Sequence, residues 1–445
     1  MRKIALILCF MMIFGLLAAC GGPATTSTPA GTSGTTAGTT TGATSGGTAA
    51  TTAASTEPVK IYIFSNQPEY SDAFNAYIEA YKSVAPHVTI DMEVNQADYP
   101  TLVKAKLSSG EVPEVFCSTA GAEIKLYMEY SADLTNEPLA AAMLDSVRAN
   151  MSYEGKVYGL PVKANCFGIV YNKTLFEEAG ITTLPKTITE MKAACEKLVA
   201  KGYTPFSNGY KEWWVQKHIF QHYLDASTDN ASDLVAKFIK GEAKFADYPL
   251  LSTNFFDFLD LTVKYGMAKP LEADLNAEIA AFGTGKAAMM TGQGPWTEEA
   301  VMAIDPNLKL GIMGYPVDDN PAHSRIITGA DQALRIYKDS PVVNEVIKLY
   351  NWLYTSEYGK KWFSDVAKVI PPIKDAPIPN LQIPQAMKAI LDSGEAVGDM
   401  AIIYSTDSFH QKFGEIAQSY LAGTIKRDQA ISEMEKAWVD LGGGN

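Results

Sequence analysis

The chain has 445 residues, of which 20% are charged and 47% hydrophobic, and its formal net charge is -13. A chain of this length is too long for one hydrophobic core, so two lobes or domains are expected. The acidic balance and the lack of a Lys/Arg cluster argue against nucleic acid as a partner.

The first residues of the chain are expected to form an export signal. Arg2 and Lys3 precede an apolar run from Ile4 to Leu17, which is shorter than the roughly 20 residues that a membrane-spanning helix needs. The run ends at Leu17-Ala18-Ala19-Cys20, which resembles a bacterial lipobox. Residues 1–19 are therefore expected to be a lipoprotein signal peptide, and the lipid on Cys20 to anchor the protein to the outward face of the cell membrane. An ordinary signal peptide with an incidental cysteine is the alternative.

The next segment is expected to be a disordered tether, from Cys20 to residue 57. Between Pro23 and Thr56 it contains only Pro, Ala, Thr, Ser and Gly, which cannot bury enough apolar surface to offset the entropy lost on ordering. As a flexible coil these residues would span roughly 30 to 35 Å. The tether would thus hold a folded body close to the membrane.

Strands and helices alternate at the start of the folded body. The sequence predicts strands at Val59 to Phe64, Val88 to Val94 and Val115 to Ser118, with helices from about Ser71 and from Tyr99 to Ser109. This order predicts a parallel α/β lobe, in which ligands lie beyond the carboxyl ends of the strands. The candidate ligand-binding residues at these ends are Asn66, Gln67, Glu69, Ser118 and Thr119.

Two later motifs resemble a known family. The first is Leu160-Pro161-Val162, followed by Tyr171-Asn172-Lys173 and Phe176-Glu177-Glu178-Ala179-Gly180. The second is an apolar strand, Ala287 to Met290, followed by Gly294-Pro295-Trp296. Both resemble the extracellular solute-binding proteins (family 1) of ABC importers, in the sugar-binding group that includes maltose-binding protein. The resemblance implies an α/β, two-lobed periplasmic-binding-protein-like fold of type II, with a ligand cleft between lobes joined by three crossing segments.

The resemblance also implies how the chain is divided between the lobes. The crossings are expected near Pro161, Gly329 and Pro371. The segments are then 58–162 in lobe one, 163–326 in lobe two, 327–371 back in lobe one, and 372–445 in lobe two and the C-terminal helices.

Trp296 is the principal ligand candidate. Gly292 and Gly294 permit close backbone approach, and Pro295 suits the first position of a helix, so the indole stands at a strand-to-helix junction. A flat ring held there can stack on the apolar face of a sugar, and the family carries a similar Gly-Pro-Trp whose Trp does so. The alternative is a core aromatic that closes the end of the strand.

Five further candidates follow from the resemblance. Asn165 lies on the first crossing and aligns with a ligand-contacting carboxylate in the maltose-binding relative, so its amide argues against maltose itself; a hinge residue bonding only backbone is the alternative. Trp213 and Trp214 occupy positions comparable to that of an aromatic residue that stacks on sugar in the maltose-binding relative. Because adjacent helix positions point about 100° apart, one of the two is expected to face the cleft. Asp331 follows the second crossing, and His410 lies in a possible lip.

Catalytic and metal-binding signatures are not evident in the sequence. Cys117, Cys166 and Cys195 are expected to be buried free thiols, with one disulfide as the alternative. His218 and His222 have a spacing that can hold a metal, but no third ligand is evident, so no metal and no cofactor are expected. No local motif pairs two carboxylates as glycosidases require, and no hydrolase motif occurs, so the chain is not expected to be an enzyme.

The sequence therefore predicts a lipid-anchored monomer on the extracellular or periplasmic side of the membrane. It would capture a sugar or oligosaccharide by closing its lobes, and deliver it to the transmembrane subunits of an ABC importer. One alternative is a binding protein for a polyamine, a glycerol phosphodiester or a peptide. Another is a surface-attached glycan hydrolase or adhesin.

Overall fold

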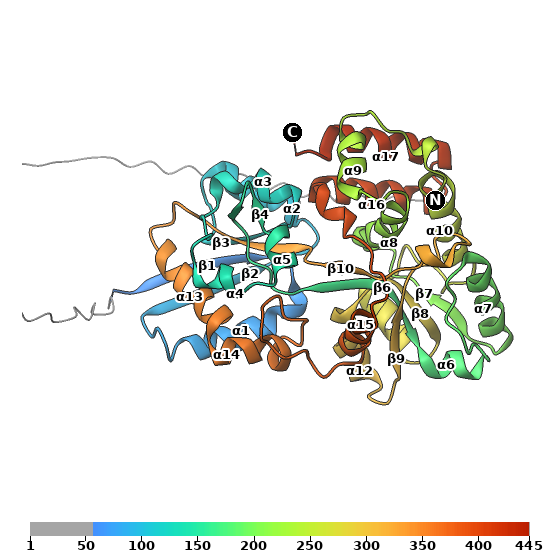
Figure 1. Cartoon of the computed structure of the whole chain (residues 1–445), viewed down its shortest axis with the longest axis horizontal. Coiled ribbons are helices and arrows are strands. Elements are labelled where there is room, and N and C mark those ends of the chain that lie inside the picture. Colours follow the sequence, from blue (N-terminus) through green and yellow to red (C-terminus); the bar gives the residue numbers. More distant parts are fainter. Residues whose placement is uncertain (1–56, 445) are drawn as a thin grey trace, which may run out of the picture. The chain divides into compact units, whose positions relative to one another are not determined.

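The computed structural model describes residues 57–444. The expected signal peptide, the lipid-bearing Cys20 and the tether up to residue 56 lie outside these residues. The described part forms two lobes, each built around its own sheet with helices packed on it (Figure 1). None of the helices within 57–444 combines the length and the apolar character needed to cross a bilayer.

The sheet of lobe one has four strands in the order β2-β1-β3-β11. β1 pairs in parallel with both β2 and β3, which confirms the predicted parallel lobe, and β11 pairs antiparallel with β3. Ile61 and Phe64 are fully buried in the core beneath this sheet. The strand bounds are β1 Val59–Ser65, β2 Val88–Val94, β3 Val115–Thr119 and β11 Gln332–Ile336.

Helices from two separate parts of the chain pack on this sheet. The rings of Phe74, Tyr77 and Tyr81 on one helix contact Trp352 and Trp362 from residues far along the sequence. These contacts unite the early and late segments of lobe one in a single core. The bounds are α1 Ser71–Tyr81, α2 Tyr99–Ser109, α3 Ala122–Leu126, α4 Pro138–Ala142, α5 Asp145–Asn150, α13 Val343–Thr355 and α14 Glu357–Lys361, with a small hairpin of β4 Ser152–Tyr153 and β5 Lys156–Val157.

The sheet of lobe two is centred on β6, Asn165–Asn172, all of whose residues are buried. β6 pairs with β8, β9 and β10, and β7 runs parallel to β8. The sequence predicted that the strand of β8 ends at Met290. The strand instead continues to Gln293, because Gln293 pairs with Gly168 of β6. The other bounds are β7 Thr204–Ser207, β8 Ala287–Gln293, β9 Leu310–Met313 and β10 Ile327–Gly329.

The helices of lobe two surround a buried central helix, α8, Trp213–Ala226, most of whose side chains are buried. The predicted capping box is present where Thr187 and Glu190 exchange side-chain and backbone hydrogen bonds at the start of α7. The remaining bounds are α6 Lys173–Glu178, α7 Ile188–Ala200, α9 Ala231–Ile239, α10 Phe255–Lys264, α11 Leu275–Gly283, α12 Glu298–Ile304, α15 Gln382–Asp392, α16 Asp407–Leu421 and α17 Arg427–Leu441.

Three segments pass between the lobes close to one another. Ala164, just before β6, bridges to Ile370. β10 pairs with β6 in lobe two, and after Ala330 and Asp331 the chain enters the sheet of lobe one as β11. The described residues therefore have the predicted two-lobed α/β architecture.

Candidate functional site

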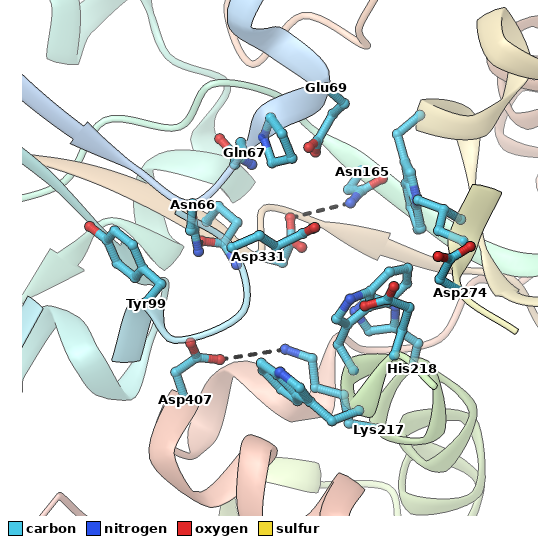
Figure 2. Close-up of a pocket in the computed structure, with 18 of the residues that line it drawn as sticks. Asn66, Gln67, Glu69, Tyr99, Asn165, Lys217, His218, Asp274, Asp331 and Asp407 are labelled. Carbon is cyan, nitrogen blue, oxygen red and sulfur yellow. Dashed lines mark hydrogen bonds and ion pairs between the residues drawn. The ribbon is translucent and has the colours of Figure 1, made fainter. Parts of the chain in front are cut away.

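A cavity of about 460 Å³ lies between elements of the two lobes (Figure 2). This volume is within the range of small-molecule sites. The loop after β1 and the start of β11 form one side of this main cavity, and the N-terminus of α8 and the turn after β8 form the other. Most of the predicted site residues line it, namely Asn66, Gln67, Glu69, Asn165, Trp213, Trp214, Trp296 and Asp331.

Three candidates do not line the main cavity. Ser118 and Thr119 are buried in β3, which lies between two other strands, and the Ser118 hydroxyl donates to the Thr119 carbonyl at 2.9 Å. β3 thus extends further than the sequence indicated. His410 is 1% exposed, with Nε2 3.0 Å from the hydroxyl of Ser405. Asp407, one turn earlier on α16, reaches the cavity in its place.

The wall of lobe one carries amide oxygens without partners. Asn66 follows β1, and its Nδ2 donates to Oε1 of Gln332 at 3.4 Å. Oδ1 of Asn66 and Oε1 of Gln67 are buried and accept no hydrogen bond from the described residues. A buried acceptor without a donor is unfavourable.

Lys163 places a buried ammonium at the centre of the site. Its Nζ donates to the hydroxyl of Tyr70 at 3.0 Å, lies 3.8 Å from a carboxylate oxygen of Glu69, and lies 5.5 Å from the ring centroid of Trp296. Burial opposes the charge, but Tyr70, Asp331 and Glu69 outweigh it and raise the pKa of Lys163 above its usual value. The side chain is therefore a fixed cation against the indole.

Asn165 and Asp331 connect two of the crossings. Nδ2 of Asn165 donates to Oδ1 of Asp331 at 3.3 Å, while Oδ1 of Asn165 accepts from the backbone N–H of Cys166 at 3.0 Å. Asn165 therefore bonds a side chain as well as backbone. Both side chains line the main cavity where the crossings meet.

The indole of Trp296 is held in a defined orientation. Its Nε1–H donates to Oε1 of Gln293 at 3.1 Å, and Nε2 of Gln293 donates to a carboxyl oxygen of Glu278 at 2.8 Å. Phe167 and His218 pack edge-on against the indole. Trp296 is half-buried, so part of the ring is open to the main cavity rather than enclosed in a core.

Glu278 is a buried carboxyl beneath this wall. The side chain is fully buried on α11, and burial raises its pKa well above the usual value of 4.5. Burial disfavours the charged form, and the nearby Glu212 raises the pKa further. Glu278 therefore acts as a fixed hydrogen-bonding group that orients Gln293.

The N-terminus of α8 supplies the rest of the aromatic wall. The sequence predicted that one of Trp213 and Trp214 faces the cleft and that the other lies in the core or on the lobe surface. Both contribute to the lining of the main cavity, and Trp214 also belongs to the hydrophobic core of lobe two, where it is 9% exposed. The neighbouring His218 donates from Nδ1 to the Gly292 carbonyl at 3.0 Å. Burial lowers its pKa well below 6.5, so the neutral ring keeps Nε2 as an acceptor.

His222, the second member of the predicted histidine pair, does not join the cavity. Its Nδ1 lies 3.3 Å from the carbonyl of Arg325. Residues 57–444 contain no group of three or more His, Cys, Asp or Glu side chains arranged to hold a metal. The three cysteines in this part of the chain, Cys117, Cys166 and Cys195, are buried free thiols.

An ionic cluster joins α3 of lobe one to α16 of lobe two. The backbone N–H groups of Thr119 and Asp407 donate to the two carboxylate oxygens of Glu123 at 2.8 and 2.9 Å. Asp407 also lies 3.7 Å from Nζ of Lys217, which lines the main cavity. Burial and the nearby Asp407 raise the pKa of Glu123 to about 7. This cluster is a direct contact between the lobes.

Carboxylates outnumber ammonium groups among the residues that line the main cavity. Lys163 and Lys217 each lie within 4.0 Å of a carboxylate oxygen. The main cavity therefore has no free cation to attract an anionic ligand among the described residues. The acidic side chains that line it are Glu69, Glu212, Asp274, Asp331 and Asp407.

Sequence reasoning missed several cavity residues. Lys163 directly follows the Leu160-Pro161-Val162 motif and could have been found there, whereas Lys217 and Asp407 come from helices far apart in the chain and carry no local signal. The missed polar and aromatic lining residues are Gln96, Tyr99, Lys163, Glu212, Lys217, His218, Asp274, Asn276, Gln332 and Asp407.

Comparison with known proteins agrees with this geometry. The model of the bacterial extracellular solute-binding protein family matches residues 65–360. The multiple sugar-binding protein of Streptococcus mutans is 25% identical over 322 residues, which cover 69% of this chain and 74% of the relative. The melibiose/raffinose/stachyose-binding protein of Bacillus subtilis is 25% identical over 302 residues, covering 64% and 67%. A solved chitin oligosaccharide binding protein, at 20% identity, superposes with a TM-score of 0.74 over 87% of this chain and all of the other.

Proposed function

Because the chain belongs to the bacterial extracellular solute-binding protein family, as its motifs predicted, we propose that it captures a sugar or oligosaccharide and delivers it to an ABC importer. The observation that carries this proposal is the main cavity between the lobes, which has indoles on one wall and amide and carboxyl groups on the other. The relatives named for sugar binding support the same ligand class.

The chemistry of the two walls suits a sugar ring. The half-buried indole of Trp296 offers a flat apolar surface, on which the C–H face of a pyranose can stack. The unpartnered oxygens of Asn66 and Gln67 and the free Nε2 of His218 would accept hydrogen bonds from ring hydroxyls. A ligand bound in this way would touch both lobes at once and favour their closure about the crossings.

A screen of the full-length protein tests the ligand class. We expect sugars from the malto-, raffinose or chito-oligosaccharide series to raise its melting temperature, since a ligand at 100 times its dissociation constant adds about 2.7 kcal/mol of stability. The radius of gyration should fall on binding, and the sugar should be recovered unchanged. New reducing ends would instead indicate a hydrolase, and polymer binding without compaction would indicate an adhesin.

A cationic solute such as a polyamine is the second candidate function. The surplus of carboxylates over ammonium groups on the wall of the main cavity favours a cation and disfavours a glycerol phosphodiester. Spermidine in the same screen separates the two candidates. Stabilisation by spermidine and by none of the sugars would replace the sugar proposal.

We further propose that the protein is a monomer anchored through a lipid on Cys20, which lies outside the described residues. The lipobox-like sequence Leu17-Ala18-Ala19-Cys20 supports this anchor. Cys20→Ser should block processing or move the protein out of the membrane fraction. A variant that is processed and fractionates like the parent would contradict the anchor, and light scattering of the solubilised protein checks the monomer.

A further inference from the structure

Lys163, on the first crossing, fills an aromatic cage with its own ammonium group. Its Nζ lies 4.8 Å from the ring centroid of Tyr70, 5.5 Å from that of Trp296 and 3.8 Å from a carboxylate oxygen of Glu69. Aromatic faces around an ammonium group are the arrangement by which proteins bind cationic ligands. Here the cation belongs to the chain itself, and Lys163 is only 7% exposed.

Lys217, on α8, repeats this arrangement at a second indole. Its Nζ lies over the ring of Trp213, 5.3 Å from the centroid, and 3.7 Å from a carboxylate oxygen of Asp407 (Figure 2). Lys217 is buried as well. Two of the indoles that line the main cavity therefore each carry an ammonium group on one side of the ring.

Both lysines are held at their rings by carboxylates. Burial opposes the charge of Lys163, but Tyr70, Asp331 and Glu69 outweigh it and hold the pKa of Lys163 above its usual value. A ligand ammonium that approached either ring would meet a like charge there. To take the place of the lysine it would also have to break a buried ion pair, which is costly.

A smaller cavity shows the same matching of carboxylates with lysines. This second cavity, of about 210 Å³, is lined by Glu69 and Lys163 and also by Glu299 and Lys368. Glu299 is paired with Lys368, as Glu69 is with Lys163. Each carboxylate that lines the second cavity therefore already has a lysine.

The main cavity keeps one buried carboxylate that the two lysines do not pair with. Asp331 is 9% exposed and accepts a hydrogen bond from Asn165, but it forms no ion pair among the described residues. A carboxylate attracts cations and also accepts hydrogen bonds from hydroxyl groups, so Asp331 does not decide between a cationic and a neutral ligand. The indoles distinguish the two, because an ammonium group on one face repels a second cation, whereas the apolar face of a sugar carries no charge and can still stack.

We propose that Lys163 and Lys217 are specificity-determining residues, which occupy the cation-binding positions of the aromatic wall and so reserve its indoles for a neutral sugar. This role rests on the proposed sugar-binding function and narrows its ligand class. It explains how a cavity with a surplus of carboxylates would select a sugar and exclude a polyamine.

Substitution of each lysine by methionine tests this role. Lys163→Met and Lys217→Met keep a long side chain and remove its charge, whereas Lys163→Arg and Lys217→Arg keep a cation that can lie on an aromatic face. Lys264→Met is the matched control, because Lys264 lies over the ring of Tyr265 but lines neither cavity. Titration calorimetry of the full-length proteins would use spermidine and members of the malto-, raffinose and chito-oligosaccharide series.

We expect the parent to bind a sugar and to bind spermidine far more weakly. In Lys163→Met and in Lys217→Met, the ratio of spermidine affinity to sugar affinity should rise at least tenfold, which corresponds to about 1.4 kcal/mol. The arginine variants and Lys264→Met should keep the parental ratio. Adding Glu69→Gln to Lys163→Met should abolish the gain, since it removes the carboxylate that the incoming cation would use.

A variant that is merely damaged would lose sugar affinity without gaining affinity for spermidine. An unchanged ratio in the methionine variants, or a parent that binds spermidine as tightly as sugar, would overturn the role of the lysines and leave sugar binding intact. A parent that binds no sugar would overturn both proposals. If Lys163→Met fails to fold, Lys217→Met decides, because it lies on a different element and beside a different indole.

Discussion

The two walls of the main cavity differ in the kind of polar group that is left without a partner. In lobe two, the Trp296 indole is fixed by hydrogen bonds that run through Gln293 to the buried Glu278. In lobe one, Asn66 and Gln67 keep buried amide oxygens without partners. The indole of Trp296 on the first wall is therefore oriented by hydrogen bonds within the protein, and the unpartnered group beside it is a donor, Nε1 of Trp214, whereas the second wall carries unpartnered acceptors. This difference favours a sequence in which the ligand first docks on the aromatic wall of lobe two and the polar wall of lobe one then closes over it.

The largest expected effect concerns the contact at which the lobes already meet. Glu123 has a pKa of about 7 against a usual 4.5, a shift that corresponds to roughly 3 kcal/mol. When the pKa of a carboxyl is higher in the folded protein than in the unfolded chain, the carboxyl makes its full contribution to stability at pH values below its pKa in the unfolded chain. This contribution is lost as the pH rises through its pKa in the folded protein. Relative to Glu123→Gln, the parent should therefore lose stability between about pH 4.5 and 7.

Chemical denaturation of both proteins across this pH range measures the difference. The comparison with the variant is needed because burial also lowers the pKa of His218 and His410, and these groups titrate in the opposite sense. A difference in unfolding free energy that stays flat from pH 4.5 to 7 would show that Glu123 is not the titrating group.

The next effect in size concerns the aromatic wall. Trp296→Ala should weaken sugar binding by about 2 kcal/mol or more, as expected for a stacking hot spot. Because the indole is only half-buried, its loss should cost less folding stability than the roughly 3 to 5 kcal/mol of a fully buried tryptophan. Calorimetry measures the affinity, and a thermal melt without ligand measures the stability.

Trp352→Ala is the matched control for Trp296→Ala. Trp352 is also half-buried and stacks on Tyr77 and Tyr358 in lobe one, but it lines neither cavity. The substitution Trp352→Ala should lower the melting temperature and leave the affinity for the sugar unchanged. If Trp296→Ala instead unfolds readily and keeps parental affinity when folded, the indole is a core residue.

The sequence predicted the elements better than the polar groups around the site. Periodicity located β1 and α1, and the Gly-Pro-Trp turn located Trp296, because both signals are local. Glu278 could not be recognised, since nothing but its burial distinguishes it from an ordinary helical glutamate. Thr119 was misplaced because β11 pairs with β3 as far as Thr119, beyond the point where the apolar run of β3 ends.

A smaller effect should follow when the support of the indole is removed. Gln293→Leu and Glu278→Leu break the chain of hydrogen bonds at different links, so Trp296 gains rotational freedom and affinity should fall by about 1 kcal/mol, the typical net value of one hydrogen bond. Glu278→Gln keeps a hydrogen-bonding group of the same size and should recover most of the affinity. The near-ultraviolet circular dichroism of the indole reports its order directly.

This result separates positioning from general stability. If Glu278→Leu lowers the melting temperature but leaves affinity and the indole spectrum unchanged, Glu278 supports the fold alone. If Glu278→Gln fails to recover affinity, the hydrogen bond to Gln293 does not orient the ring.

A loss of affinity of similar size is expected at the polar wall, but there affinity and stability should move in opposite directions. Gln67→Ala removes a buried acceptor that has no partner among the described residues, so the free protein should be as stable as the parent or slightly more so. With ligand present the same oxygen would accept a hydroxyl, and its loss should weaken binding by roughly 0.5 to 1.5 kcal/mol. Ser118→Ala, in a buried strand away from both cavities, is the control and should leave affinity unchanged. A Gln67→Ala protein that is destabilised but binds like the parent would mean that this oxygen serves the fold, and that the two walls do not differ as described.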